Sequence, residues 1–403
     1  MKILHINAVY GMGSTGVIVE DIHKLCLEEN IESFVAYSTS KYKAEEIVGG
    51  IEIGGCFGKK MHAVLCRING MQAYFSRLAT KAFLNKVKVI SPDIVVLHNL
   101  HSNYINLNML LGFLAKQNIK TVVVLHDCWY YTGGCFHYTA AGCNKWLEGC
   151  GSCPKKKQDT PAYLFGKSAK ILKDRKNHFD SIKDLTVVGV SEWISSEAEK
   201  TFLRGKTVTI HNGVDTDLFK PTPSDFKKRY GIEDKFMVLG PASKWLSAIN
   251  KETFDTVVSK LPDDSIMVLL GCTEQQVKAL PKNVIALPYI KDREELKKVY
   301  SAADVFVNCT REESLSLINV EAQSCGTPVI TYQNTGAKET VDNICGFSVQ
   351  NGNAKELVEK ILFLKQKGKA FFTSACRQWV KKEFNKESNY SKYIKLFEEI
   401  NNR

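Results

Sequence analysis

The chain has 403 residues, and its 54 Lys plus Arg against 43 Asp plus Glu give a formal net charge of +11 at pH 7. Hydrophobic residues make up 44% and charged residues 24%, which is typical of globular proteins and excludes a disordered, collagen-like or coiled-coil chain. Because a single core stops growing at roughly 250–300 residues, the length predicts two domains. No apolar run approaches the roughly 20 residues that span a bilayer, and the N-terminus lacks signal-peptide organisation. We therefore expect a soluble, cytoplasmic protein.

The positive charge suits an anionic partner, such as a nucleotide diphosphate, a lipid surface or a nucleic acid, although a solvated excess of lysine explains it equally well. The largest basic block is Lys155–Lys157 and no nucleic-acid-binding motif accompanies it, so we predict no nucleic-acid partner. In a chain without an export signal, the 13 cysteines are more typical of thiols or metal ligands than of disulfides.

The first half alternates apolar strands with helical patterns. Strands are predicted at Lys2–Asn7, Ser33–Tyr37, Asp93–His98, Thr121–His126 and Thr186–Ser191, and helices at Gly16–Asn30 and Leu107–Gln117. Continuous apolar strands separated by helices indicate a parallel sheet that is covered on both faces.

The second half repeats this pattern. Strands are predicted at Phe236–Gly240, Ser265–Gly271, Asn283–Leu287, Asp304–Asn308 and Pro328–Thr331, and helices at Glu294–Ala303, Asn319–Cys325 and Tyr390–Ile400. Asn212-Gly213 and two prolines interrupt the pattern at 206–223, where we place the linker. The predicted parts are an N-terminal domain at 1–205, a C-terminal domain at 206–385 and a final helix at 386–403. Ligands of such α/β domains bind beyond the carboxyl ends of the strands, so the informative residues should follow strands.

A glycine-rich turn, Gly11–Gly16, follows the first strand and opens a helix. It matches the G-x-G-x-x-G pattern of dinucleotide-binding proteins. A nicotinamide enzyme also needs an acid at the end of the second strand, where this chain has Ala36–Thr39 and no carboxylate. We favour contact with an anion or a sugar near Gly13 and Ser14 over a dinucleotide site or a turn that only packs strand on helix.

Histidines follow two of the predicted strands. His126 and Asp127 come after Thr121–Leu125, and His98 occupies the same place after Asp93–Leu97. Although a lone histidine is more often structural, two at strand ends of one sheet favour a functional role with hydroxyl or phosphate groups.

Four cysteines, Cys135, Cys143, Cys150 and Cys153, lie in a glycine-rich loop at 128–154. The last two form a C-x-x-C pair, which is a common half-site for zinc. We predict a structural zinc site with these four ligands. Free thiols packed under the loop, or disulfides formed on isolation, are the alternatives.

Two carboxylates, Glu313 and Glu321, follow the strand Asp304–Asn308. We expect the turn to place Glu313 before a helix beginning near Asn319 and Glu321 within its first turn. Free backbone N–H groups there could hold a phosphate, and carboxylates accept hydrogen bonds from sugar or ribose hydroxyls. Taken alone, either residue could simply cap a helix.

The chain resembles the family 4 retaining glycosyltransferases, and the resemblance covers nearly its whole length. The motifs that carry it are Glu313 with Glu321-Ala322, Cys325–Val329, Asn334–Gly336, Ile210–Asp215 and Ala302–Val307. The segments Gly13–Gly16, His126–Trp129 and Gly149–Pro154 resemble a bacterial subgroup linked to surface-polysaccharide assembly.

This resemblance implies a GT-B fold, in which two Rossmann-like α/β domains with parallel sheets face an interdomain cleft. The N-terminal domain would serve the acceptor and the C-terminal domain the nucleotide sugar, with the last helix crossing back. It implies the following contacts: Glu313, His126 and Asp127 at the reacting sugar, Glu321 at the ribose, the amides of Leu315, Ser316 and Leu317 at the diphosphate, and Gly13 and Ser14 beside the phosphates and acceptor. The family needs no metal at the diphosphate.

One position departs from the family. The subgroup places Arg-Lys-Gly three residues after a tryptophan to neutralise the diphosphate, whereas Ala248, Ile249 and Asn250 stand after Trp245 here. We expect Lys244 or Lys251 to supply the charge. If neither does, the donor site is altered or inactive, because such charges are often worth several kcal/mol in the transition state.

The leading hypothesis is a hexosyltransferase that moves a sugar from a UDP- or GDP-sugar to a hydroxyl of a glycan or lipid-linked acceptor. A lipid-linked acceptor would bring the protein into peripheral contact with the inner membrane face. The first alternative is a non-catalytic GT-B protein that binds a nucleotide or glycan. The second, a nicotinamide oxidoreductase, is weakened by the missing acid.

Overall fold

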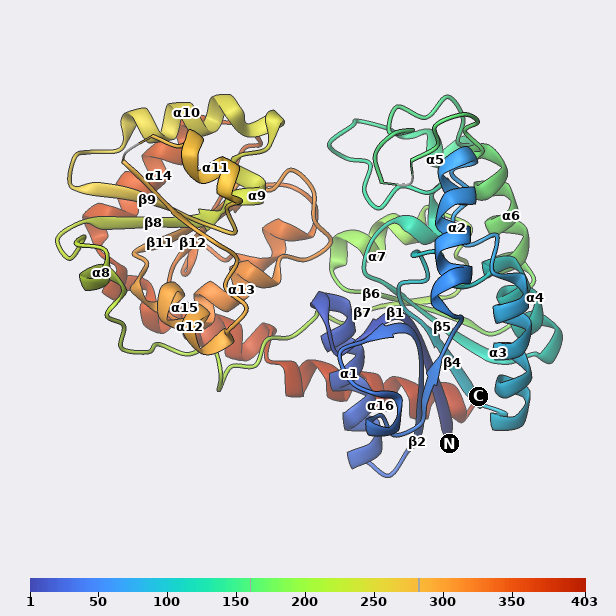
Figure 1. Cartoon of the computed structure of the whole chain (residues 1–403). Helices are drawn as coiled ribbons and strands as arrows, with labels where there is room; N and C mark the ends of the chain where they lie inside the picture. Colours follow the sequence, from blue (N-terminus) through green and yellow to red (C-terminus); the bar gives the residue numbers. More distant parts are fainter. Residues whose placement is uncertain (160, 282) are drawn as a thin grey trace. The chain divides into compact units, whose positions relative to one another are not determined.

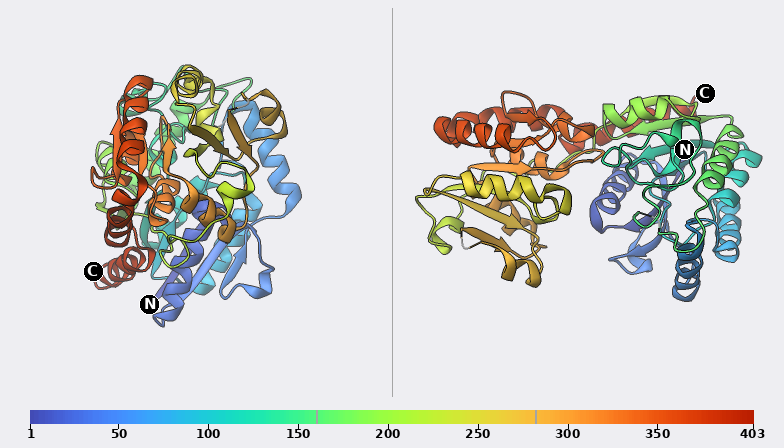
Figure 2. Two further views of the ribbon diagram at one scale, coloured as in Figure 1. Left: turned by 90° about the vertical axis from the view of Figure 1, so that its left-hand side faces the viewer. Right: turned by 90° about the horizontal axis from the view of Figure 1, so that it is seen from above.

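The computed structural model describes residues 1–159, 161–281 and 283–403. They form two compact units, Met1–Ile210 with Tyr390–Arg403 and His211–Asn389. Each unit is an α/β domain with a parallel sheet, and Figures 1 and 2 show helices packed around each sheet.

The first unit contains a seven-stranded sheet of order β3-β2-β1-β4-β5-β6-β7. Its strands are β1 (Lys2–Tyr10), β2 (Glu32–Ser40), β3 (Gly50–Glu52), β4 (Ile94–Leu97), β5 (Lys120–Leu125), β6 (Leu185–Gly189) and β7 (Lys206–Thr209). Its helices are α1 (Gly13–Glu28), α2 (Cys56–Asn69), α3 (Arg77–Ile90), α4 (Leu107–Gln117), α5 (Lys145–Glu148), α6 (Ser168–Asp180) and α7 (Glu192–Glu199), with 3-10 turns η1 (Ala44–Glu46) and η2 (Trp129–Tyr131). Figure 1 shows α3, α4 and α6 grouped on the side of this sheet opposite α1.

The second unit contains a six-stranded sheet of order β10-β9-β8-β11-β12-β13. Its strands are β8 (Phe236–Pro241), β9 (Ser265–Leu270), β10 (Val284–Leu287), β11 (Val305–Asn308), β12 (Val329–Tyr332) and β13 (Gly346–Val349). Its helices are α8 (Phe226–Arg229), α9 (Ala242–Trp245), α10 (Lys251–Lys260), α11 (Glu274–Ala279), α12 (Arg293–Ala302), α13 (Leu317–Ser324), α14 (Ala354–Lys367) and α15 (Lys369–Glu383), with 3-10 turns η3 (Ala248–Asn250) and η4 (Thr335–Thr340). Figure 1 shows α10 and α14 on one side of the sheet and α12, α13 and α15 on the other.

The last helix, α16 (Lys386–Asn401), contributes residues 390–401 to the first unit. The ring of Phe397 lies 6.0 Å from the ring of His5 on β1. Nζ of Lys120 donates to the carbonyl of Ile400 at 2.8 Å. Residues from the two ends of the chain therefore build one core.

The central strands are apolar along their whole length. Ile94–Leu97 and Val122–Leu125 are completely buried, and every strand pair in both sheets is parallel. This confirms the predicted fold class, because strands that helices cover on both faces need no polar face. None of the helices among the described residues is both long and apolar enough to cross a membrane.

The linker prediction needs a correction at its start. Residues 206–209 form β7, which pairs with β6 at the edge of the first sheet. The sequence did not predict this strand because Val208 is its only apolar residue. A strand at the edge of a sheet is less buried than a central one and does not need a continuous apolar run.

Each sheet has a point at which the chain order reverses. These points lie between β1 and β4 in the first sheet and between β8 and β11 in the second. Ligands of open α/β sheets bind beyond the strand ends at such points. The segments that follow these strands are Gly11–Gly16, His98–His101, Ala242–Trp245 and Cys309–Ser316.

Candidate functional site

In the second unit, a buried tryptophan positions Lys244 at the carboxyl end of β8. Trp245 is fully buried and its Nε1 donates to the carbonyl of Val307 at 3.0 Å. A Cβ added to Gly240 would lie 2.2 Å from that Nε1, so the indole fits only against glycine. The tryptophan thus anchors the short helix α9 and fixes the point from which the Lys244 side chain extends.

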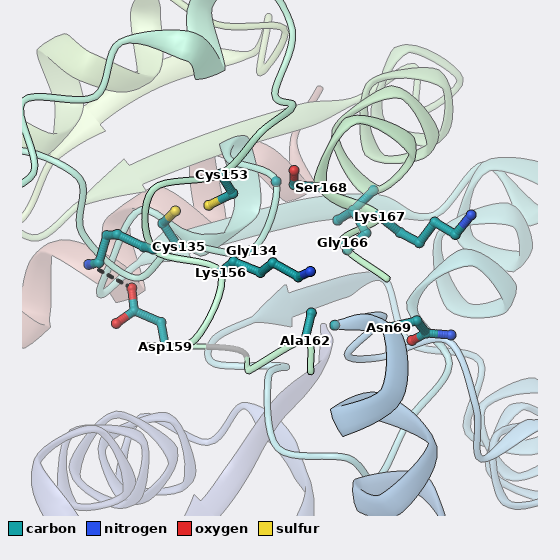
Figure 3. A pocket seen from close by; sticks show the side chains of 14 residues that line it. Asn69, Gly134, Cys135, Cys153, Lys156, Asp159, Ala162, Gly166, Lys167 and Ser168 are labelled. Atoms are coloured by element: carbon teal, nitrogen blue, oxygen red, sulfur yellow. Dashed lines mark ion pairs between the residues drawn. The ribbon is translucent and has the colours of Figure 1, made fainter. Parts of the chain in front are cut away.

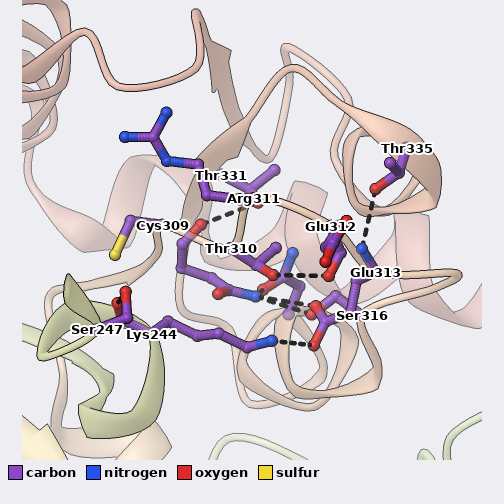
Figure 4. A network of polar contacts seen from close by, with 12 residues as sticks. Lys244, Ser247, Cys309, Thr310, Arg311, Glu312, Glu313, Ser316, Thr331 and Thr335 are labelled. Atoms are coloured by element: carbon purple, nitrogen blue, oxygen red, sulfur yellow. Dashed lines mark hydrogen bonds and ion pairs between the residues drawn. The ribbon is translucent and has the colours of Figure 1, made fainter. Parts of the chain in front are cut away.

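Lys244 forms an ion pair with Glu313. Its Nζ lies 3.1 Å from Oε1 of Glu313, and the side chains are 30% and 24% exposed. Figure 4 shows Lys244 reaching from α9 toward Glu313, which lies in the loop before α13. The other candidate lysine, Lys251, pairs instead with Asp255 at 3.1 Å, and its side chain is 78% exposed.

The loop that carries Glu313 is held by its own backbone. The Glu313 N–H donates to Oγ1 of Thr335 at 3.1 Å, and its carbonyl accepts from the N–H of Gly336 at 3.1 Å. Nδ2 of Asn308 donates to Oγ of Ser316 at 2.9 Å, which ties the end of β11 to the cap of α13. Leu315 and Ser316 are buried just before the helix, and Leu317 is its first residue. The N–H groups of a first helical turn have no partners within the helix and lie at the positive end of its dipole.

Glu321 lies deeper in α13 than the sequence predicted. The helix begins at Leu317 rather than near Asn319, so Glu321 is in its second turn. Ser316 has an extended backbone and occupies the N-cap position without a capping hydrogen bond from its side chain. Tyr300 donates its hydroxyl to Oε2 of Glu321 at 3.1 Å. Burial raises the pKa of Glu321 to about 7, against the opposing effects of Arg293 and of this hydrogen bond.

The sequence analysis missed Arg311. It binds the segment 248–250, where the subgroup that this chain resembles carries Arg-Lys-Gly. Its Nε donates to Oδ1 of Asn250 at 2.8 Å, and its NH2 group donates to the carbonyl of Ile249 at 3.2 Å. Figure 4 shows its guanidinium directed away from the Lys244–Glu313 pair. Its place three residues after β11 is the signal that could have found it.

In the first unit, three histidine rings form a chain that runs from within β1 to the ends of β4 and β5, with His5 and His98 fully buried. Nε2 of His126 lies 3.2 Å from Nδ1 of His98, and Nε2 of His98 lies 3.3 Å from Nδ1 of His5. Burial lowers the pKa of His126 to about 4, with Asp127 opposing this shift and His101 adding to it. Burial likewise lowers the pKa of His5 and His98, so all three rings are neutral at pH 7. Nδ1 of His126 is buried, and it has no hydrogen-bond partner among the residues described.

Asp127 turns away from this chain and pairs with a different histidine. Its Oδ2 lies 3.0 Å from Nε2 of His101, and its Oδ1 accepts from the N–H of Trp129 at 2.8 Å. Burial alone would raise the pKa of Asp127, but His101, the Trp129 amide and His137 together lower it. Asp127 is therefore ionised and engaged in holding the loop after β5.

The glycine-rich turn opens α1 at Gly13, three residues earlier than predicted. Gly11 and Gly13 have φ of +68° and +64°, a conformation that favours glycine. A Cβ on Gly16 would lie 3.0 Å from Cγ2 of Val9, so the helix packs closely on β1. Gly13 and Ser14 are exposed in the first turn of α1.

The four cysteines line one small cavity of about 20 Å³ in the first unit. Figure 3 shows Cys135 and Cys153 pointing toward each other, near the ion pair of Lys155 with Asp159. The Cys135 thiol donates a hydrogen bond to Cys153, which raises the pKa of Cys135 and lowers that of Cys153. Across the described ranges, no three His, Cys, Asp or Glu side chains come together closely enough to hold a metal ion. The zinc site therefore stays a prediction.

Comparisons with known proteins agree with this fold. Residues 263–398 match the family "Glycosyl transferases group 1". The chain is 21% identical, over 89% of its length and 90% of the relative's, to "Putative colanic acid biosynthesis glycosyl transferase WcaC" of Escherichia coli K12.

Two solved structures share the architecture. Sucrose-phosphate synthase from Thermosynechococcus elongatus superposes with a TM-score of 0.72 at 16% identity, covering 99% of this chain and 98% of that one. Anabaena HepE, solved in complex with UDP and glucose, superposes with a TM-score of 0.66 at 17% identity, covering 99% of each chain. The protein thus has the GT-B fold, and its residues 263–398 are similar to the glycosyl transferases group 1 family.

Proposed function

We propose that this chain is a retaining glycosyltransferase. It moves a sugar from a UDP- or GDP-sugar to a hydroxyl of a glycan or lipid-linked acceptor in bacterial surface-polysaccharide assembly. The ion pair of Lys244 with Glu313, beside the start of α13, is the observation that carries this proposal. Support for the biological role comes from the likeness to WcaC along most of the chain. Support for a UDP donor comes from the UDP and UDP-glucose complexes of HepE.

In this mechanism, Lys244 and the backbone amides at the start of α13 stabilise the negative diphosphate as it leaves. Leu315, Ser316 and Leu317 supply these amides, which are aimed at the phosphates before the reaction begins. Glu313 accepts hydrogen bonds from hydroxyls of the donor sugar and orients Lys244. Glu321 accepts from the ribose hydroxyls.

The chemical step exchanges one C–O bond for another. The acceptor oxygen bonds to the anomeric carbon on the face from which the diphosphate departs, and the acceptor proton passes to a phosphate oxygen. Neutral His126 contributes Nδ1 to a sugar hydroxyl, and Asp127 holds the loop that presents it. Gly13 and Ser14 border the phosphates and the acceptor.

Calorimetric titration with UDP, GDP, ADP and NADH tests this proposal first. We expect one nucleoside diphosphate to bind and its sugar conjugates to be consumed when a glycan or lipid-linked acceptor is added. Binding of NADH alone would instead favour the oxidoreductase hypothesis, against which the chain has no carboxylate in Ala36–Thr39.

A second candidate is a GT-B protein that binds a nucleotide sugar without turnover. The absence of Arg and Lys at Ala248 and Ile249 favours it. Tight donor binding with neither transfer nor hydrolysis, across a panel of donors and acceptors, would support this alternative.

A further inference from the structure

One face of α2 is apolar and exposed. Phe57, Met61, Val64 and Ile68 are 79%, 47%, 55% and 37% exposed. At about 100° per residue, their spacing of four, three and four residues places them within an arc of about 60°. We call these four residues the α2 stripe. Four large side chains aligned in solvent are a contiguous patch rather than the scattered exposure common on protein surfaces.

A loop extends this patch beyond the end of the helix. Tyr163, Leu164 and Phe165 are each about 60% exposed. The N–H of Tyr163 donates to the carbonyl of Arg67 at 2.8 Å, and the N–H of Leu164 donates to the carbonyl of Ile68 at 3.0 Å. The loop is thereby fixed to the last turn of α2.

The segment that carries the α2 stripe is basic, and Glu52, the acidic residue that precedes it, pairs with Lys59 of α2 at 3.2 Å. Between Glu52 and Asp93 the chain contains no acidic residue and seven basic ones: Lys59, Lys60, Arg67, Arg77, Lys81, Lys86 and Lys88. Lys60 and Arg67 lie about 70° and 90° from the centre of the stripe on the helix circumference, both on the same side of it. An apolar face bordered by lysine and arginine, with aromatic residues along it, is the pattern of helices that lie in a membrane interface.

The neighbouring face of α2 borders a polar cavity. The cavity, about 530 Å³, is lined by Cys56, Lys59, Lys60 and Ala63 of α2, by Glu52 and by hydroxyl-bearing residues at the end of β2. Oδ1 of Asn103, in the cavity wall, is buried and has no partner among the described residues. Lys60 lies between the stripe and this cavity, so a molecule held in the bilayer could present a polar head to the cavity.

We infer that the α2 stripe and the 163–165 loop dock on the surface of an anionic lipid bilayer. The basic residues meet the lipid headgroups, and the apolar side chains enter the interface. The docking does not depend on the transfer reaction. The cavity beside Lys60 then receives the polar head of a lipid-linked acceptor. This link to catalysis rests on the proposed function.

Vesicle co-sedimentation of the full-length protein tests this inference. We expect binding to phosphatidylglycerol vesicles and little binding to phosphatidylcholine vesicles, because the charge term requires anionic lipid. Phe57→Ser with Met61→Ser should weaken binding by about tenfold or more, through loss of apolar burial. Lys60→Gln with Arg67→Gln should weaken it and flatten its dependence on salt.

The control removes an equally exposed apolar side chain elsewhere. Val277 on α11 is 48% exposed, and Val277→Ser should leave vesicle binding unchanged.

Unchanged binding of the Phe57/Met61 variant, with a normal thermal unfolding midpoint, would overturn the inference. A parent dimer that this variant converts to a monomer, measured by sedimentation velocity without vesicles, would assign the face to a second copy and overturn it too. Because UDP titration without vesicles tests the donor site alone, failure of the proposed function would be seen separately.

Discussion

Nζ of Lys244 lies 3.1 Å from Oε1 of Glu313, although the two residues are separated by 69 positions in sequence. The pair joins the segment after β8 to the segment after β11, and these two strands flank the reversal point of the second sheet. The contact places a positive charge next to the carboxylate that the family motif assigns to the donor sugar. At the proposed donor site, Lys244 is a cation that the Ala248-Ile249-Asn250 segment does not supply.

Glu313→Ala is expected to lower the rate of sugar transfer by about 10²–10³-fold, because an interaction with the reacting sugar and the partner of Lys244 are both lost. The free energy of unfolding should change by less than about 1 kcal/mol, since the pair is partly exposed. Transfer assays beside urea unfolding measure both quantities. Full activity of this variant would contradict the site assignment.

Lys244→Ala is expected to weaken UDP binding by about tenfold or more, because a charge-assisted contact to the diphosphate is removed. Lys251→Ala is the matched control, since its lysine is 78% exposed and pairs with Asp255. Calorimetry should detect no change for this control. Equal losses in both variants would indicate that general surface charge, rather than the position of Lys244, governs affinity.

Glu321 should make nucleotide affinity depend on pH. Burial raises its pKa to about 7, so a large fraction of the carboxyl is protonated near neutral pH, and the ionised form is the better acceptor for two ribose hydroxyls. UDP affinity is expected to rise from about pH 6 to about pH 8. Glu321→Gln should remove this contribution and leave that of the phosphate groups. An identical pH profile for the two proteins would show that Glu321 does not meet the ribose.

The same carboxyl affects folding in the opposite direction. Because its pKa is raised in the folded state, the folded protein holds this proton more tightly than the unfolded chain. The contribution of Glu321 to stability is therefore greatest at low pH and is lost as the pH rises toward 7. Glu321→Gln should become stabilising relative to the parent above about pH 7, as urea unfolding at several pH values would show.

The four-cysteine hypothesis predicts about one zinc ion per chain. The sulfurs already line one cavity, but tetrahedral ligation requires the Cys143 and Cys150 side chains to move toward the Cys135–Cys153 pair. Metal analysis of protein purified under reducing conditions without chelators measures the content. Cys150→Ser should lower it, whereas the buried Cys309, in the second unit, provides a neutral control as Cys309→Ser. A metal-free parent would leave these residues as thiols packed beneath the loop.

The sequence predicted the parts of the fold that are defined by continuous apolar runs. Ile94–Leu97 and Val122–Leu125 are such runs, and they became central strands. It did not predict β7, because an edge strand with a single valine has no such run. It also did not predict α2, whose apolar residues include four that face solvent instead of the core.

The candidate site was predictable to the extent that its residues follow strands. Glu313, His126 and Lys244 all do so, and a family motif marks two of them. The pairing of Lys244 rather than Lys251 with Glu313 was not predictable, because it depends on how Trp245 packs against Gly240. The role of Arg311 was hidden for a related reason, since its partners Ile249 and Asn250 lie about 60 residues earlier in the chain.

The three histidine rings of the first unit have a further consequence, which concerns the direction of their protons. A neutral imidazole carries one N–H, so both ring-to-ring hydrogen bonds must run the same way. If they run from His5 toward His126, Nδ1 of His126 is a donor; if they run back, it is an acceptor. At the far end, Nε2 of His5 lies 4.0 Å from Sγ of Cys26 on α1. A ligand group that can only donate to Nδ1 of His126, or only accept from it, therefore selects one tautomer for every ring, including the His5 ring next to the Cys26 thiol.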